Sequence, residues 1–400
     1  MSKKYEDDEE IPMIEGIDGE DDGETKDKKK SKKKKSVGKI ILTVVIVILI
    51  LAVLVAIAGL IIFHNYYEKL NYDDGKGSVN IEAMTTEYIP EEDPDIDPTA
   101  TETDAEVVLS YEEQLRVNLE DQSTPIKYSD DVYNILLVGH DSRYRDLLGN
   151  SDSMIVVSIN KKTEEITLTS IMRDIYLYRP DHGYGRINGA FAMGGPDLLI
   201  QTIEENFKID IDCYVAVSFY SFMDVVDAVG GVEITVKDEE IWIFNKYIDE
   251  LNSLTGQPHG DGYLSAGGTY HLTGKQALAY SRIRYVGNAD YERTERQRRV
   301  LNEIFSEAKD SNLVELNDLL NTILPNIITD ISEGEMLSLL LNFSTDYKDY
   351  DIKQARVPYD GTFTPMNVGG AAVLGIDIQA NIDYMHRDIY GEGTGTADTN

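Results

Sequence analysis

The sequence predicts an α/β fold in which a central mixed β-sheet is flanked by helices, preceded by one N-terminal transmembrane helix. Two observations predict this class. Between residues 131 and 390, apolar runs of strand length alternate with segments of helical periodicity. Before this region, residues 40–63 form one long apolar run without a charged side chain. The chain has 400 residues, enough for a single sizeable domain and additional segments.

Short apolar runs bounded by turn residues indicate the strands of the domain. Two of them are joined by Asn160-Lys161-Lys162-Thr163, which predicts a hairpin. The expected strands are Val132–Val138, Met154–Ile159, Ile166–Ile171, Tyr214–Phe219, Val232–Val236 and Ile352–Val357. The expected helices are Pro196–Phe207, Ser221–Val229, Lys275–Tyr280, Arg293–Lys309, Val314–Ile323 and Glu335–Phe343.

The apolar run of residues 40–63 is longer than the roughly 20 residues that span a bilayer. It also exceeds the apolar region of a cleaved signal peptide, so we expect a retained membrane anchor. Lysines crowd residues 28–39 on its N-terminal side, which places residues 1–39 in the cytoplasm as an acidic and lysine-rich tail. Everything after residue 63 is then extracytoplasmic, with Tyr66 and Tyr67 at the level of the outer headgroups.

The segment between the anchor and the domain, residues 64–130, is acidic and is expected to form a stalk that is partly helical near Val107–Leu119. The domain itself is expected over residues 131–390, followed by a disordered tail over residues 391–400. The chain holds 72 acidic and 37 basic residues, a net charge of -35, which argues against binding to nucleic acid. The single cysteine, Cys213, is expected to be a small buried side chain.

Two aspartates flank the loop between the first two predicted strands. Asp141 follows the end of one strand and Asp152 precedes the next. Ligands of open α/β sheets gather beyond the strand ends, and two carboxylates there are suited to a divalent cation beside phosphate. On spacing alone, both aspartates are equally well explained as turn formers.

Arginines are concentrated in a second region, residues 280–299. Arg282 and Arg284 alternate, and Arg293 and Gln297 share one helix face. Arginine is the side chain that binds phosphate through two parallel hydrogen bonds, so this region predicts an anion site. A solvated charged face would explain Arg298 and Arg299 equally well. Two further arginines, Arg173 at a strand end and Arg186 in a glycine-rich loop, are expected to join the same crevice.

These stretches, in this order, resemble the LytR-CpsA-Psr family of extracytoplasmic bacterial proteins. The resemblance covers residues 132–301 and includes Val226-Asp227-Ala228-Val229-Gly230-Gly231-Val232. It implies a phosphotransferase that moves an anionic glycopolymer, such as teichoic acid or capsular polysaccharide, from a polyprenyl-pyrophosphate carrier to peptidoglycan in a Gram-positive envelope. By the family pattern, Asp141 and Asp152 are the magnesium ligands, and the pyrophosphate-binding positions are Arg173, Arg186, Arg282, Arg284, Arg293 and Gln297. Asp290 matches a further acidic position.

Three residues depart from the family pattern. Asn150 stands where the family has arginine, Arg186 where it has lysine, and Met172 where it has proline. Asn150 removes one cation from the expected site, whereas Arg186 keeps the charge with a different geometry.

The residues predict metal-assisted phosphoryl transfer in which Asp141, Asp152, Arg173, Arg282 and Arg284 are catalytic. Either aspartate is suited to accept the proton of the acceptor hydroxyl. Two alternatives stay open. One is a pyrophosphatase that acts on the same lipid with water as acceptor. The other is a non-catalytic envelope regulator that binds the lipid and signals through the N-terminal tail.

Overall fold

The computed structural model of the chain describes residues 52–76, 79–85, 100–121, 123–141, 148–283, 290–310, 317, 320–322 and 324–391. It separates into two compact units, residues 1–62 and 63–400. Residues 52–67 are helical, and none of the helices in the described ranges has both the length and the hydropathy needed to cross a membrane. The first twelve residues of the predicted span, 40–51, and both predicted tails, 1–39 and 392–400, lie outside the described residues.

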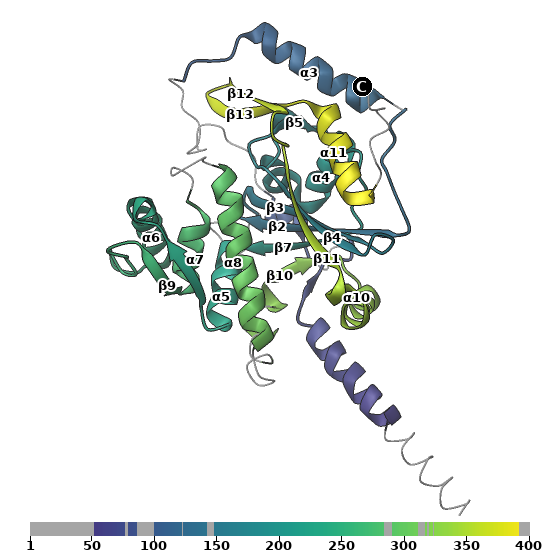
Figure 1. Cartoon of the computed structure of the whole chain (residues 1–400), viewed down its shortest axis with the longest axis vertical. Coiled ribbons are helices and arrows are strands. Elements are labelled where there is room, and N and C mark those ends of the chain that lie inside the picture. Colours follow the sequence, from purple (N-terminus) through teal and green to yellow (C-terminus); the bar gives the residue numbers. More distant parts are fainter. Residues whose placement is uncertain are drawn as a thin grey trace, which may run out of the picture. The chain divides into compact units, whose positions relative to one another are not determined.

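The domain is built on a seven-stranded mixed sheet, which confirms the predicted fold class (Figure 1). Three of its strand pairs are parallel, β1 with β10, β7 with β2, and β4 with β11, and the other three are antiparallel. The predicted hairpin is present as β3 and β4, which pair antiparallel next to β2. In spatial order the strands are β1 (Asn71–Tyr72), β10 (Ile327–Thr329), β7 (Cys213–Ser218), β2 (Val132–His140), β3 (Ser151–Asn160), β4 (Glu165–Ile171) and β11 (Asp351–Val357).

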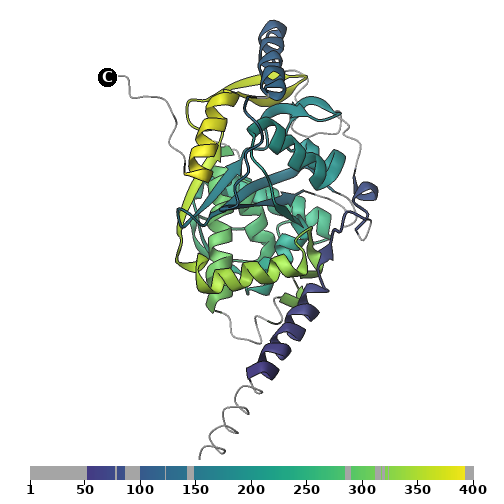
Figure 2. The ribbon, with the colours of Figure 1, turned by 90° about the vertical axis from the view of Figure 1, so that its right-hand side faces the viewer.

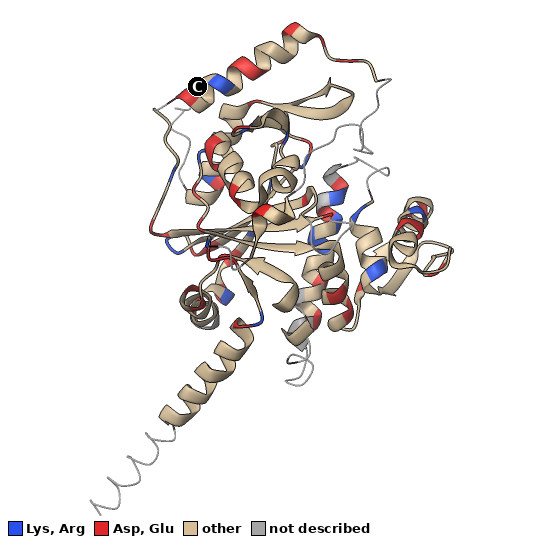
Figure 3. Cartoon of the chain, turned by 180° about the vertical axis from the view of Figure 1, so that it is seen from behind, with Lys and Arg blue, Asp and Glu red and all other residues tan. Residues whose placement is uncertain are grey.

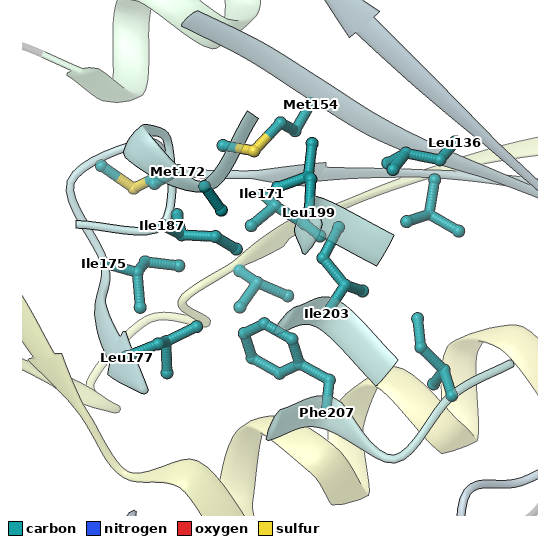
Figure 4. Packing of buried hydrophobic residues seen from close by; sticks show 14 of the residues in the cluster. Leu136, Met154, Ile171, Met172, Ile175, Leu177, Ile187, Leu199, Ile203 and Phe207 are labelled. Carbon is teal, nitrogen blue, oxygen red and sulfur yellow. The ribbon is translucent and has the colours of Figure 1, made fainter. Parts of the chain in front are cut away.

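One face of the sheet packs on the main hydrophobic core. Side chains of β2 alternate between buried and partly buried, and Leu136 and Val138 point into this core. Helices α4 (Gly189–Phe207) and α11 (Ile378–Tyr390) cover it (Figure 2), and the close-up in Figure 4 shows Leu199, Ile203 and Phe207 of α4 facing the sheet. α4 bends where Gly195 adopts a φ of 67°, directly before Pro196, which explains why the helical pattern was recognised only from Pro196 onwards.

The helices α5 (Phe219–Ala228), α6 (Ile241–Thr255), α7 (Gly274–Ser281) and α8 (Asp290–Asp310) form a second core with the β8–β9 ribbon (Val232–Val236 and Gly268–Leu272). α7 begins very close to α5, because a Cβ at Gly274 would lie 2.2 Å from the backbone oxygen of Met223. This group of helices stands beside the other face of the sheet, and the space between them becomes the site described below.

The remaining described elements complete the chain around these two cores. Two small ribbons, β5–β6 and β12–β13, pack near the main core. The elements are β5 (Tyr176–Arg179), β6 (Gly183–Arg186), β12 (Phe363–Val368), β13 (Ala371–Ile376), α2 (Ile81–Met84), α3 (Ala105–Glu120), α10 (Glu333–Thr345) and the 3₁₀ helices η2 (Asp238–Glu240), η3 (Leu324–Asn326) and η4 (Tyr347–Asp349). Most of the predicted helix Val314–Ile323 lies outside the described residues.

Part of the segment predicted as a stalk belongs to the domain instead. β1 adds a strand to the sheet beside β10. The predicted helix near Val107–Leu119 is present as α3, but it buries Tyr111 and Leu115 in the main core. The Tyr111 hydroxyl donates a hydrogen bond to the backbone oxygen of Tyr176 at 2.8 Å. The acidic composition of the segment predicts a solvated stalk. The helix packs on the domain instead because Tyr111 and Leu115, two apolar residues one turn apart, are buried there.

We expect Leu115→Ala to lower the free energy of unfolding by about 2–5 kcal/mol, because the side chain is fully buried. Leu109→Ala on the same helix is the matched control, since Leu109 is 63% exposed, and its effect should stay within about 0.5 kcal/mol. Chemical denaturation of both variants measures the difference. Equal effects would mean that α3 does not contribute to the domain.

Candidate active site

A cavity of about 670 Å³ lies between the second face of the sheet and helices α5, α6 and α8. Its volume falls within the usual range for sites that bind small molecules or cofactors. The strand residues that line it alternate with those that point into the main core, as Leu137 does with Leu136. Much of the wall is apolar, and it consists of Leu137, Ile155, Val215, Val217, Phe219, Phe222, Val225, Leu278, Leu301, Ile304 and Ile327.

The polar part of the cavity gathers residues from widely separated stretches of the chain. Every predicted site residue that the structure describes lines this one cavity: Asp141, Asp152, Arg173, Arg186, Arg282, Arg293 and Gln297. Arg284 lies outside the described residues, as does the side chain of Asp290. Asn150, at the position where the family has arginine, also lines the cavity.

The strand pairing explains why the first group converges. β2 and β3 are antiparallel, so the end of β2 and the start of β3 meet at one edge of the sheet, where His140 is paired with Ser151. Asp141 follows His140 directly, and Asp152 is the extra residue of a β-bulge between the pairs His140–Ser151 and Gly139–Ser153, so both lie at this edge. β4 ends at the same edge, because Ile171 pairs with Met154, and Arg173 follows two residues later.

Buried ion pairs hold the arginines of this edge. Arg173 donates a hydrogen bond from Nη1 to Oδ1 of Asp152, and its Nε lies 3.5 Å from Asp174 Oδ1. The same Asp174 oxygen is 3.8 Å from the Nε of Arg186. All three side chains of the Arg173, Asp174 and Arg186 group are more than nine-tenths buried. Fixing a guanidinium in this way removes most of the rotamer freedom that a phosphate contact would otherwise have to restrict.

The two cavity carboxylates differ in their electrostatic environment. Burial and the neighbouring charge of Asp152 raise the pKa of Asp141, Arg173 and Arg282 oppose them, and the net pKa is about 7. Burial also acts to raise the pKa of Asp152. There, however, the guanidinium groups of Arg173, Arg293 and Arg282 outweigh it, and the net pKa is lowered. Asp152 is therefore a stable carboxylate at neutral pH, whereas Asp141 is poised between its two protonation states.

Arg282 approaches the cavity from the end of α7 and is clamped by α5 and α6. Its Nη2 donates a hydrogen bond to Glu250 Oε1 at 2.9 Å. Its guanidinium carbon lies 5.1 Å from the ring centre of Phe219 and 4.8 Å from that of Tyr247. The other terminal nitrogen, Nη1, is buried and has no hydrogen-bond partner among the residues that the structure describes. A buried charged donor without an acceptor is costly, so this nitrogen is prepared for an anion that enters the cavity.

Three other arginines of residues 280–299 have structural partners. Arg296 is 3% exposed and pairs at 2.8 Å with both Glu240 and Glu292, which fixes α8 against the end of η2. Arg298 donates to Ser170 at 3.0 Å. Arg299 pairs with Glu295 at 2.6 Å on the exposed side of α8, as a solvated charged face would predict. The arginines of α8 lie in its N-terminal half, and Glu303 and Glu307 follow in the C-terminal half; Figure 3 colours the basic and acidic residues of the chain.

The donor set of the cavity fits a divalent cation beside a phosphate. Asp141 and Asp152 supply two carboxylates whose mutual repulsion a cation would relieve. Within the described ranges, no group of three or more His, Cys, Asp or Glu side chains is arranged to hold a metal by itself. Magnesium sites of this kind take one or two carboxylates and complete their shell with phosphate oxygens and water.

Sequence reasoning missed the contribution of α6. Lys246, Tyr247 and Glu250 line the cavity, and no helix was predicted over Ile241–Thr255. The signal was present, because Phe244, Ile248 and Leu251 recur at helical spacing and are buried. Asp174, which holds Arg173 and Arg186, was also missed, since an aspartate that follows a strand is typical of an ordinary turn.

A comparison with known protein families identifies the family of the chain. The model of the LytR_cpsA_psr family matches residues 99–385. The chain belongs to this family. The match begins before α3, in agreement with the packing of that helix on the domain.

Relatives and solved structures of the family are similar over most of the domain. A protein of Oceanobacillus iheyensis named polyisoprenyl-teichoic acid–peptidoglycan teichoic acid transferase TagU is 35% identical over 222 residues, which cover 54% of this chain and 63% of that protein. A protein of Enterococcus faecalis with the same name is 33% identical, over 54% of this chain and 67% of its own.

Two solved structures share the fold. The structure of protein gbs0355 from Streptococcus agalactiae aligns with a TM-score of 0.53 and 26% identity, over 67% of this chain and 91% of that one. A structure described as TagT bound to LI-WTA aligns with a TM-score of 0.51 and 27% identity, over 67% and 95% of the two chains.

We expect Glu250→Ala to lower kcat/KM for a lipid-linked donor about fivefold, because Arg282 loses the partner that orients it. Glu250→Gln keeps an oxygen that accepts the hydrogen bond and should retain most of the activity. The kinetic constants of both variants distinguish positioning from a simple change of charge. If Gln and Ala reduce kcat/KM equally, the hydrogen bond to Arg282 is not what matters.

Proposed function

We propose that this protein transfers an anionic glycopolymer from a polyprenyl-pyrophosphate carrier to a hydroxyl group of peptidoglycan. The product linkage is a phosphodiester. Membership of the LytR_cpsA_psr family and the names of the relatives support the reaction class. The alignment spans 63% of the Oceanobacillus relative, so the substrate and the acceptor are part of the proposal.

The observation that carries the proposal is the buried Nη1 of Arg282, which no described residue bonds, in a cavity that joins a cluster of arginines to an apolar wall. A polyprenyl pyrophosphate has the complementary chemistry, because a diphosphate is joined to a long apolar chain. The diphosphate accepts hydrogen bonds from Arg282, Arg173, Arg186 and Arg293, and the first isoprene units lie along the apolar wall that includes Leu137 and Val215.

In the transfer step, the acceptor hydroxyl oxygen attacks the phosphorus that carries the glycopolymer. A new P–O bond forms to the acceptor, and the bond from that phosphorus to the bridging oxygen breaks. Polyprenyl phosphate leaves with the electron pair. The hydroxyl proton passes to a cavity carboxylate, for which Asp141 is better placed because Asp152 is held by Arg173. The arginines stabilise the charge that develops on the phosphoryl oxygens and on the leaving group.

We also propose magnesium as the cofactor, held by Asp141 and Asp152 together with the diphosphate. When bound, the cation would neutralise negative charge on the pyrophosphate. The replacement of arginine by Asn150 lowers the positive charge that the protein itself supplies at this edge of the sheet, so the cation contributes a larger share.

We place the domain outside the cell, with residues 40–63 as a single membrane span and the N-terminus in the cytoplasm. The described part of this segment, residues 52–63, is helical and carries no charged residue. The lysines before the span give the orientation. The domain then lies on the same side of the membrane as a carrier lipid in the outer leaflet. Absence of lipid contact at Leu60 in the reconstituted protein would contradict this placement.

Arg282→Ala and Arg293→Ala should each lower transfer from a lipid-linked donor by about 100-fold or more, because each removes a buried donor to the diphosphate. Arg299→Ala on the exposed side of α8 is the matched control and should stay within about threefold. The assay follows a covalent polymer–glycan adduct. Normal transfer by Arg282→Ala would refute the site, and polymer release without an adduct would favour a pyrophosphatase.

A divalent cation should bind to the full-length protein more tightly when a prenyl diphosphate is present, because the phosphate oxygens complete the coordination shell. Electron paramagnetic resonance of Mn²⁺ measures the bound fraction without requiring turnover. Asp141→Asn and Asp152→Asn should each weaken binding, whereas Asp130→Asn, a change at a surface carboxylate, should not. Unchanged Mn²⁺ affinity in both cavity variants would remove the cation from the proposal.

A further inference from the structure

Helix α10 exposes a group of large apolar side chains that no described element covers. Leu340, Leu341 and Phe343 are 52%, 59% and 56% exposed. They lie within four consecutive positions, and residues 336–345 contain no charged side chain. Such a group is unusual on a chain with a net charge of -35, and exposed apolar patches of this kind mark contact surfaces.

The exposed apolar residues span about 160° of the helix surface, from Phe343 through Leu340 to Leu341. At 3.6 residues per turn, Met336, Leu339, Leu340 and Phe343 share an apolar arc that extends to Leu337 and Leu341. Ser338, Asn342 and Thr345 occupy the remaining arc. The charged residues of α10, Glu333 and Glu335, lie in its first turn, and the turns that follow combine an apolar arc with an uncharged polar side. Met336, Leu337 and Leu339 are partly buried, so only part of the apolar arc is left exposed. An amphipathic helix with an uncovered apolar side is suited to lie in a membrane interface.

The start of α10 is bonded to the residues that follow the apolar run of residues 40–63. The hydroxyl of Tyr67 donates to the backbone oxygen of Ile331 at 3.0 Å. Nδ1 of His64 lies 2.8 Å from Oε1 of Glu333. The hydroxyl of Tyr66 donates to Asn317 at 2.6 Å. The first two contacts hold the N-terminal end of α10, and the third holds Asn317, beside the point where the chain leaves the proposed span, which is where the headgroups lie.

The same region connects to the cavity through the sheet. β1, which directly follows these residues, pairs with β10, and Ile327 of β10 lines the cavity. A surface that fixes α10 on the bilayer therefore also fixes the height of the cavity above it. For a carrier lipid that moves from the outer leaflet into the cavity, a fixed height shortens the search for the bound position.

We propose that the apolar arc of α10, formed by Leu340, Leu341 and Phe343, docks on the outer leaflet of the membrane. This inference rests on the proposed anchor and extends it. The occupant is a lipid surface rather than a second copy of the chain, because the helix begins among residues that already lie at headgroup level. The absence of charge along residues 336–345 agrees with insertion between headgroups and acyl chains.

The experiment places a fluorophore at single cysteines of the full-length protein with Cys213→Ser, a buried position outside the cavity. The protein is reconstituted in vesicles of phosphatidylglycerol and phosphatidylethanolamine, with or without a lipid that carries a shallow doxyl quencher. Leu340→Cys is the test position and Phe343→Cys is a second one. Ser338→Cys, about 160° away on the same helix, is the matched control. Leu60→Cys reports on the anchor itself.

We expect at least twofold stronger quenching at residues 340 and 343 than at residue 338, together with quenching at residue 60. Equal quenching at 338 and 340, with residue 60 quenched, overturns the docking but keeps the anchor. If residue 340 is protected both from the lipid quencher and from a quencher dissolved in the aqueous phase, a second copy of the chain covers it. This result also overturns the docking. No quenching at residue 60 rejects anchor and docking together. Polymer transfer by the Cys213→Ser protein is measured separately, so a failure of the proposed reaction remains distinguishable.

Discussion

Neutralisation of a diphosphate by arginines that converge at one edge of a sheet is the interaction on which the account depends. The chain carries a large excess of negative charge, so an anionic lipid headgroup is repelled almost everywhere else. At this edge of the sheet, positive side chains locally outweigh negative ones. Arg173 and Arg293 are buried beside Asp152, and Arg282 is held by Glu250 with one nitrogen left for the ligand. The aspartates do not cancel the site, because they are outnumbered and hold the guanidinium groups in place.

The sheet makes this arrangement possible by dividing its two faces between stability and function. One face of β2 and β3 is packed with α4 and α11 in a core that contains Leu136 and Val156. The opposite face, with Leu137, is left beside a cavity because α5, α6 and α8 form a core of their own. Apolar side chains that would ordinarily be covered by a helix are thereby available to an apolar ligand. The geometry therefore supplies both a charged end and an apolar wall.

The sequence predicted the elements that have strong local signals. The strands of the β3–β4 hairpin, β7 and β8 lie where alternation and turn residues indicated, and the arginine and aspartate stretches reach one cavity as expected. The elements with mixed patterns were missed. α6 and α11 interleave polar and aromatic residues, and β12 and β13 form a two-stranded ribbon outside the main sheet. Part of the segment predicted as a stalk packs on the domain instead. An acidic composition predicts that a segment is solvated, but the burial of Leu115 depends on residues far away in the chain.

Individual contacts between side chains could not be predicted from the sequence, for a similar reason. Nothing in the spacing of residues 241–255 indicates that Glu250 meets Arg282, since α6 and the end of α7 approach only after the second core has formed. The same holds for Arg296, which belongs to the arginine-rich stretch but is used to fix α8 through Glu240. Residue type predicted the chemistry of the site, and tertiary packing selected which arginines take part.

The most direct test is a crystal structure of the protein with farnesyl pyrophosphate. The account predicts that the diphosphate lies in the cavity within hydrogen-bond distance of Arg282 Nη1, near Arg173 and Arg293, with the isoprenoid chain against Leu137 and Val215. A diphosphate bound at another surface, with Arg282 Nη1 still without an acceptor, would contradict it.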